Sequence, residues 1–303
     1  MIARNKKSFL SVRNWLRRTE TEAQGRRAEN YHLSRVEVLL RGGLGNQLFG
    51  YAAGTELATR LGVPLHLIVQ PNMGTLGAER TFVLESVLPS DVTWSDIGVV
   101  AKRFQEASFA FDPEFAELME PCLLDGYFQS WRYFENSEER IRKQISSTPE
   151  FVHGGKLVGQ EFLAVHVRRG DYLIPRNAKI HGLVPFEFFI VGLDYLRKIH
   201  GNLPAILFSD DVSEAKRLSL ELDRCDVFDE DHKKGPLETL GAFSAAQGHV
   251  ISNSSFSWWG AFLRGNDNIV IAPRPWFVDP SIDTTDLLRP RWISMGFARP
   301  SVP

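Results

Sequence analysis

Five short, mainly apolar stretches recur along the chain, and four of them end in a polar or glycine-rich cluster. They span residues 36–40, 162–167, 205–208, 250–251 and 269–272, with helical spacing of apolar residues in between, as in 48–61. Continuous apolar stretches between turn signals are typical of strands buried on both faces of a parallel sheet. The pattern predicts an α/β fold. In such sheets ligands bind beyond the carboxyl ends of the strands, so the polar clusters are the candidate site.

A length of 303 residues permits two α/β domains with a cleft between them. A polar stretch from Ser146 to Gln160 places the boundary. We therefore expect an N-terminal extension over 1–35, a first domain over 36–155 and a second over 156–303. Within the first domain, residues 64–69 read as a strand, and 74–77 and 86–96 as loops.

Charge and cysteine content exclude several classes of protein. The chain has 35 Lys and Arg against 37 Asp and Glu, a net charge of −2, which argues against a nucleic-acid binder. Its two cysteines, Cys122 and Cys225, are too few and too far apart for a zinc site or a disulfide framework, so we expect reduced thiols. No apolar stretch approaches the roughly 20 residues that cross a bilayer, and no signal sequence is visible. We expect a cytoplasmic protein.

Residues 1–35 are basic, with nine Lys and Arg against three Glu, a net of +6 that leaves −8 for the remainder. Apolar residues lie among these cations, as in Phe9, Trp15 and Leu16. One interpretation is an amphipathic segment in peripheral contact with an anionic inner membrane face. The other is a solvated extension without a partner.

The strongest cluster is the heptapeptide from His166 to Tyr172, at the end of the second apolar stretch. Arg168 and Arg169 place two planar guanidinium groups at a strand end, where they suit a diphosphate. The alternative is a surface ion-pair cluster in which Asp171 neutralises both arginines. His166 shares the face of the strand with Arg168, either near the same ligand or as a buried core histidine.

A second cluster spans residues 252–260 and reads as a strand end that feeds a helix. Backbone N–H groups at a helix start, with the hydroxyl groups of Ser254, Ser255 and Ser257, are suited to hold phosphate oxygens. The alternative is an ordinary N-cap before a core helix, and Trp258 and Trp259 read as packing residues.

Two weaker clusters complete the edge. The loop from Gly42 to Gln47 lets backbone approach a ligand, and it lacks both the Walker ending and the dinucleotide fingerprint. Asp210 and Asp211 suit ribose hydroxyls or the edge of guanine, or else cap the next helix. A magnesium site is a further alternative for these carboxylates, but the arginine pair already supplies the positive charge that a metal would bring.

Together these clusters resemble the galactoside α-1,2-fucosyltransferases of glycosyltransferase family 11. The matching segments are GGLGNQLF (42–49), HVRRGDY (166–172), FSDD (208–211) and SNSSFSWWGAFL (252–263), and the resemblance spans about residues 36–295. It implies a GT-B-like fold, with two Rossmann-type parallel-sheet domains facing a central cleft. The first would be the acceptor-side domain and the second would bind the donor, GDP-β-L-fucose. The resemblance also allows the terminal segment to cross back to the first domain.

The resemblance further implies inverting, metal-independent transfer of fucose to the 2-hydroxyl of a terminal galactose-type residue. The acceptor would be a galactose-terminated oligosaccharide or a lipid-linked glycan, as in O-antigen biosynthesis. Arg168 would bind the β-phosphate, and Asp171 is the first candidate for the general base, with His181 second. The implied donor-binding residues are Gly45, Asn46, Gln47, His166, Arg169, Asp210, Asp211, Asn253, Ser254, Ser255 and Ser257.

The sequence departs from the family pattern at position 50, where Gly replaces the usual Gln, and we expect looser contacts in the cleft there. The helix before residue 252 is also rich in Ala and Gly. These departures keep two alternatives open. One is a GT-B fucosyltransferase of another linkage, such as α-1,6, and the other is a catalytically silent binder of nucleotide sugars or glycans.

Overall fold

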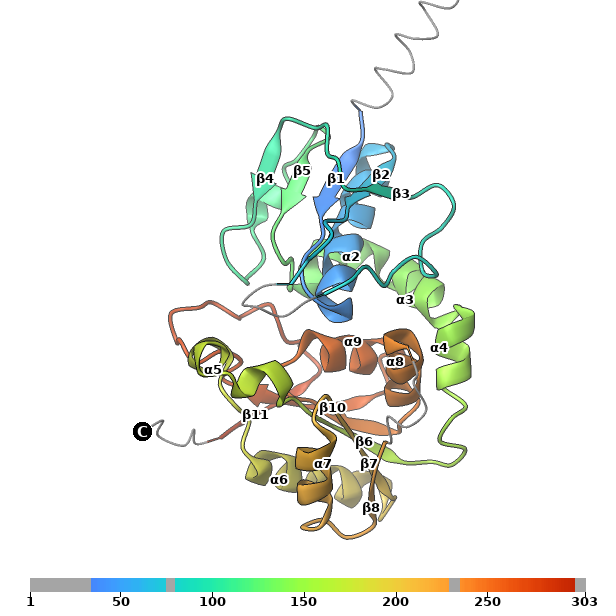
Figure 1. Cartoon of the computed structure of the whole chain (residues 1–303), viewed down its shortest axis with the longest axis vertical. Coiled ribbons are helices and arrows are strands. Elements are labelled where there is room, and N and C mark those ends of the chain that lie inside the picture. Colours follow the sequence, from blue (N-terminus) through green and yellow to red (C-terminus); the bar gives the residue numbers. More distant parts are fainter. Residues whose placement is uncertain (1–33, 75–79, 229–234, 298–303) are drawn as a thin grey trace, which may run out of the picture.

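The computed structural model describes residues 34–74, 80–228 and 235–297 and contains two parallel sheets (Figure 1). The basic extension therefore lies outside the described residues, except for Ser34 and Arg35, and its membrane contact stays a prediction. No helix among the described residues is long and apolar enough to cross a membrane. No group of three or more His, Cys, Asp or Glu in that part of the chain is arranged to hold a metal ion.

The first sheet has five parallel strands in the order β3-β2-β1-β5-β4. These strands are β1 (Val36–Leu39), β2 (Leu65–Ile68), β3 (Thr93–Ser95), β4 (Arg103–Gln105) and β5 (Leu123–Asp125). The strand expected over 64–69 is confirmed as β2, whereas β3 lies in a stretch expected to be a loop. We call the described residues up to 125 the N-terminal half.

The second sheet has six parallel strands in the order β11-β10-β9-β6-β7-β8. They are β6 (Leu163–Val167), β7 (Ala205–Ser209), β8 (Cys225–Val227), β9 (Gly248–Val250), β10 (Ile269–Arg274) and β11 (Ile293–Gly296). All five residues of β6 are buried, as a central strand covered on both faces requires. We call the described residues from 163 onward the C-terminal half. With this second sheet, the predicted α/β class and the two parallel sheets are confirmed.

Helices cover both faces of the second sheet. In Figure 1, α8 (Pro236–Ser244) and α9 (Ser255–Arg264) lie on the face toward the first sheet, and α6 (Phe186–His200) and α7 (Val212–Ser219) lie on the opposite face. The remaining helices are α2 (Leu44–Leu61), α3 (Glu138–Ser146), α4 (Pro149–Gly154) and α5 (Pro175–His181), with 3-10 helices at Pro113–Phe115, Trp131–Ser137 and Gly170–Leu173.

The helix after the first strand begins at Leu44, four residues earlier than the spacing predicted. Gly45, Asn46 and Gln47 therefore lie in the first turn of α2, and the expectation of a loop over these residues is wrong. The helix ends where Gly62 adopts the left-handed conformation, with φ of 65°. Most of its residues are buried because α2 packs between the first sheet and α9.

One hydrophobic core joins the two halves. Phe49 of α2 lies against the rings of Trp258 and Trp259 of α9, with centroids 4.7 and 5.1 Å away. Both tryptophans are fully buried, so their interpretation as packing residues is confirmed. A second core, under α6 and α7, lies on the other face of the second sheet. The two halves thus pack against each other through α2 and α9, which fixes the distance between the carboxyl ends of the two sheets.

Gly241, the single glycine of α8, has a packing reason. A Cβ at Gly241 would lie 2.2 Å from the carbonyl oxygen of Phe151, and a Cβ at Gly154 would lie 2.0 Å from that of Glu238. Helices α4 and α8 therefore touch backbone to backbone. Because α4 precedes β6 and packs on α8, the connection between the sheets is fixed to the C-terminal half.

The last strand, β11, stays in the second sheet beside β10. The segment before it reaches the N-terminal half instead. The ring of Phe277 lies 4.6 Å from that of Phe109, and the carboxylate of Asp286 accepts a hydrogen bond from the backbone of Phe111 at 3.2 Å. Residues 277–286 thus cross to the N-terminal half, and the chain then returns to the second sheet as β11.

Candidate active site

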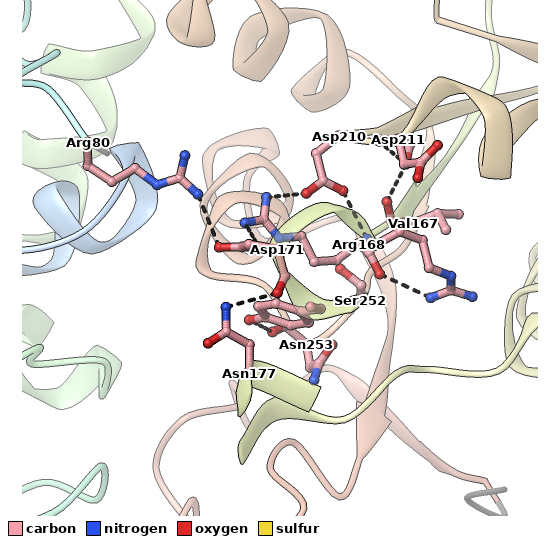
Figure 2. Close-up of polar contacts among 12 residues, drawn as sticks. Arg80, Val167, Arg168, Asp171, Asn177, Asp210, Asp211, Ser252 and Asn253 are labelled. Atoms are coloured by element: carbon pink, nitrogen blue, oxygen red, sulfur yellow. Dashed lines mark hydrogen bonds and ion pairs between the residues drawn. The ribbon is translucent and has the colours of Figure 1, made fainter. Parts of the chain in front are cut away.

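Arg168 directly follows β6 and lies between two carboxylates. Its guanidinium group is 2.5 Å from Asp171 and 2.9 Å from Asp210, which follows the neighbouring strand β7 (Figure 2). Burial disfavours the cation, but Asp210 and Asp171 outweigh that effect and hold the pKa of Arg168 above its ordinary value. The side chain is 18% exposed, so it is a preorganised cation that still reaches solvent.

Gly170 makes this arrangement possible. A Cβ at this position would lie 2.1 Å from Oδ2 of Asp210, the oxygen that pairs with Arg168. The glycine of the Arg-Arg-Gly-Asp sequence is therefore required by the close approach of the Asp210 carboxylate. Any side chain there would displace Asp210 from Arg168.

Arg169 points away from Arg168 and is buried. Its guanidinium group lies 4.7 Å from the ring centre of Phe186 and 3.7 Å from the carboxylate of Glu214. Burial lowers its pKa, and Glu214 offsets part of this effect. The expectation that both guanidinium groups share one ligand edge is therefore wrong, because that of Arg169 is engaged with Phe186 and Glu214 instead. Arg169 contributes to the edge through its backbone N–H, which donates to Asp210 at 2.9 Å.

The two aspartates after β7 have separate contacts. Asp210 accepts from the backbone of Arg169 and pairs with Arg168, so both of its oxygens are engaged in the observed conformation. Asp211 caps α7 by accepting from the backbone N–H of Glu214 at 3.1 Å, which confirms the capping alternative. Contact of either carboxylate with ribose or guanine stays a prediction.

His166 is a buried core histidine, 4% exposed, on the strand β6. Its Nδ1 lies 2.7 Å from the hydroxyl of Ser252, and its ring is packed between Phe243 and Phe256. Burial, together with the charge of Arg168, lowers the pKa of His166 to about 3, so the imidazole is neutral at pH 7. His166 thus supports the segment that leads into α9.

A neutral buried imidazole makes stability depend on pH. The pKa of His166 in the fold, about 3, lies below its ordinary value of 6.5, so the unfolded chain binds the proton first as pH falls. The stabilisation of the fold by the neutral His166 ring is therefore full above pH 6.5 and is lost as the pH falls toward about 3. We expect the difference in unfolding free energy between wild type and His166→Gln to shrink by about 1 kcal/mol per pH unit below 6.5. Urea unfolding at neutral and mildly acidic pH measures it, and a constant difference contradicts the assignment.

The serine-rich cluster forms the start of α9. Ser254 is the N-cap residue but makes no capping hydrogen bond with its side chain, and Ser255 begins the helix. Ser257 is fully buried and donates to the carbonyl of Ser254 at 3.1 Å. Asn253 donates to the carbonyls of His181 and Trp276, at 2.8 and 3.0 Å. In the observed conformation Asn253 and Ser257 thus hold the backbone of this edge, and their contact with a donor stays a prediction.

The N-termini of α2 and α9 meet where the two halves face each other. A Cβ at Gly45, in the first turn of α2, would lie 2.4 Å from the carbonyl carbon of Ser255 in the first turn of α9. Neither helix has a side-chain cap or an acidic residue in its first turn. The positive ends of the two helix dipoles therefore lie side by side. Tyr172, whose ring lies 5.2 Å from the Arg168 guanidinium group, donates to the carbonyl of Asn253 just before α9, so both helix starts belong to the surroundings of Arg168 and favour a bound anion.

Gln47 is fully buried and holds a neighbouring segment of the chain. Its amide nitrogen donates to the carbonyls of Gly42 and Thr81, at 3.0 and 2.8 Å, and its amide oxygen accepts from the backbone of Val83 at 3.1 Å. Asn46 differs, since it is half-buried and accepts from the amide of Gln129 at 2.9 Å. The contact expected between these two amides and the donor sugar stays a prediction.

Arg80 is a site residue that the sequence motifs did not single out. Its guanidinium group lies 3.2 Å from Oδ2 of Asp171, so an ion pair links the N-terminal half to the arginine-rich cluster (Figure 2). Arg80 follows a stretch without a recognisable motif, and it is separated from Asp171 by 91 positions. Only the segment held by Gln47 brings it to the edge.

His181, the second candidate base, lies at the end of α5. Its ring stacks on that of Tyr172 with centroids 4.4 Å apart, and Phe277 lies 5.7 Å away. Burial lowers the pKa of His181, so its ring is neutral at pH 7, and its buried Nδ1 has no hydrogen-bond partner among the described residues. Asp171, the first candidate, is engaged with Arg168 and Arg80. Both assignments stay predictions.

The chain is similar to known proteins in sequence and in fold. The chain is 29% identical to an alpha-1,2-colitosyltransferase from Escherichia coli over 289 residues, which cover 86% of this chain and 99% of that protein. It is 26% identical to galactoside alpha-(1,2)-fucosyltransferase 1 from Bos taurus over 254 residues, 77% of this chain and 67% of that protein. Among solved structures, fucosyltransferase NodZ from Bradyrhizobium has a TM-score of 0.50 at 12% identity, over 76% of this chain and 93% of that one.

The solved structure shows likeness of fold alone, and it agrees with the expected GT-B-like arrangement. The family itself is established by sequence. The model of glycosyl transferase family 11 matches residues 29–296, which span both sheets and all four polar clusters. The chain is therefore a glycosyltransferase and belongs to glycosyl transferase family 11.

Proposed function

We propose that the protein transfers L-fucose from GDP-β-L-fucose to the 2-hydroxyl of a terminal galactose-type residue, with inversion and without a metal. The observation that carries this proposal is Arg168, a preorganised cation beside the N-termini of α2 and α9. Such an edge suits a diphosphate. The α-1,2 linkage and the galactoside acceptor are supported by the names of the relatives in the same family.

Leaving-group stabilisation is the main catalytic contribution that we assign to this edge. Breakage of the bond between the sugar C1 and the phosphate oxygen builds negative charge on the departing diphosphate. A fixed guanidinium group and two helix N-termini interact more strongly with that charge than with the intact donor. This difference lowers the barrier, because the groups are already in place before the reaction. Arg168 therefore acts on the transition state.

Inversion requires the acceptor hydroxyl to attack the face of the sugar opposite the diphosphate, while a base removes its proton. We assign this role to Asp171, whose carboxylate lies beside Arg168 and 22% exposed. Its contacts with Arg168 and Arg80 must loosen before it accepts a proton. His181 is the second candidate, since its neutral ring lies in the same cluster against Tyr172.

Incubation of the full chain with GDP-fucose and a panel of Gal- and GalNAc-terminated acceptors tests the proposal. We expect a product one fucose heavier, an α-1,2 linkage by NMR, and an unchanged rate in the presence of a chelator. A second arm uses nucleotide-activated colitose, because one relative carries that sugar in its name. An α-1,6 product would overturn the linkage. Absence of any product, with GDP still raising the melting temperature, would favour a silent binder.

A further inference from the structure

A single carboxylate bridges two arginines from opposite halves of the molecule. Oδ1 of Asp171 lies 2.5 Å from Arg168, and its Oδ2 lies 3.2 Å from Arg80 (Figure 2). A carboxylate held between two guanidinium groups offers two anionic oxygens to two planar forks, and a phosphate offers the same. The position of Asp171 is thus one that an anionic phosphate group of a ligand suits equally well.

The backbone of Arg80 is held in place by polar contacts of the segment around it. Gln47, which is fully buried, bonds to the carbonyl of Thr81 and the backbone N–H of Val83, on the two residues that flank Phe82. The backbone N–H of Arg80 donates to Asn72 at 3.3 Å. Since a buried amide is costly unless its groups are paired, this anchoring is specific and directs Arg80 toward the C-terminal half.

The Arg80 side chain lies beside the start of α2. A Cβ at Gly43, the N-cap position of α2, would lie 3.6 Å from Nε of Arg80, an ordinary van der Waals distance, so the arginine passes next to the backbone of this helix start. Its side chain is 35% exposed. Arg80 therefore combines an anchored backbone with a guanidinium group that is accessible to a ligand at the helix start.

The charges of this cluster balance as two cations against two anions: Arg80 and Arg168 against Asp171 and Asp210. Both carboxylates would repel a bound diphosphate unless one of them leaves its arginine partners to the phosphate oxygens. Asp210 is also held by the backbone N–H of Arg169, whereas Asp171 is held by the two arginine side chains. Asp171 is therefore the carboxylate that a diphosphate replaces.

We propose that Arg80 is a second ligand for the donor diphosphate, supplied by the N-terminal half, and that the diphosphate displaces Asp171 from both arginines. This inference rests on the proposed function, because it takes a nucleoside diphosphate as the ligand. It gives the N-terminal half a direct part in donor binding. It also releases the carboxylate of Asp171 at the moment when the donor is bound.

Calorimetric titration of the full chain with GDP and with guanosine tests the role of Arg80. For Arg80→Ala we expect GDP to bind about tenfold more weakly or worse, and guanosine to bind as in wild type, because only a charge-assisted phosphate contact is lost. Arg103→Ala is the matched control. Arg103 pairs with Asp125 at 3.2 Å in the same half, outside this cluster, and should leave both affinities unchanged.

A second pair of variants distinguishes whether Arg80 binds phosphate or only links the two halves. In Asp171→Asn the ion pair with Arg80 is weakened, and GDP should bind more tightly because a competing charge is gone. If Arg80 binds phosphate, Arg80→Ala still weakens GDP binding about tenfold in the Asp171→Asn background. If Arg80 only tethers the halves, Arg80→Ala lowers the melting temperature of the wild type and has no effect on GDP affinity in either background, which overturns the inference.

The outcomes also separate this inference from the proposed function. Loss of GDP binding in Arg168→Ala with full binding in Arg80→Ala overturns the role of Arg80 and leaves the donor site intact. A wild type that fails to bind GDP overturns both. An equal loss of guanosine and GDP binding in Arg80→Ala shows a structural effect and overturns the phosphate contact.

Discussion

Replacement of Arg168 by alanine is expected to abolish fucosyl transfer while the fold survives. The guanidinium group is the fixed charge that we assign to the departing diphosphate, and it lies at the carboxyl end of the central strand β6. Removal of one such preorganised group typically lowers turnover by about 10²- to 10³-fold. Initial rates of transfer from GDP-fucose to a galactoside measure the loss.

Control variants distinguish lost chemistry from lost structure. Arg217, in the same half, pairs with Glu214 at 3.0 Å and is largely exposed, so Arg217→Ala should keep full activity. Arg168→Lys keeps the charge but not the planar fork, and it should recover part of the rate. Melting temperature and circular dichroism report whether Asp171 and Asp210 tolerate loss of their partner. Transfer above a tenth of the wild-type rate in a folded Arg168→Ala would contradict the assigned role.

Replacement of Gly45 by alanine is expected to separate α2 from α9. The added Cβ would lie 2.4 Å from the carbonyl carbon and 2.6 Å from the carbonyl oxygen of Ser255, which are backbone atoms and cannot rotate away. Overpacking of this kind costs about 1–3 kcal/mol or more, against a gain of about 1 kcal/mol from the better helix former. Because the clash is with backbone, we expect the upper end of this range, a net loss of about 2 kcal/mol or more in urea unfolding, and loss of transfer because the two helix N-termini no longer meet.

Gly50→Ala on the same helix is the matched control. Its Cβ would lie 3.2 and 3.3 Å from side-chain atoms of Leu40 and Val38, which can adjust, so stability should change by no more than about 1 kcal/mol. Equal effects of Gly45→Ala and Gly50→Ala would contradict the special role of the contact between helices. Gly50 faces the side chains of Leu40 and Val38 rather than the cleft, so the expectation of looser contacts in the cleft is wrong. The departure from the family pattern at this position affects the core of the N-terminal half.

The fold and the position of the site could be predicted because both depend on local pattern. Continuous apolar stretches such as 162–167 must be buried on both faces, which requires a parallel sheet with helices on either side. The polar clusters then fall at the carboxyl ends of neighbouring strands, as the registry of β6 with β7 and β9 confirms. The start of α2 was misplaced because glycines that permit close helix contact look like loop residues in sequence.

Side-chain direction and partnership were decided by the tertiary structure. The sequence by itself determined the parallel α/β architecture, the family and the edge on which Arg168 lies. It did not determine that Arg169 turns inward under Phe186, that Gln47 is buried as an anchor, or that Arg80 reaches Asp171. An ion pair across 91 positions depends on how two sheets pack through α2 and α9, and no local propensity encodes that distance.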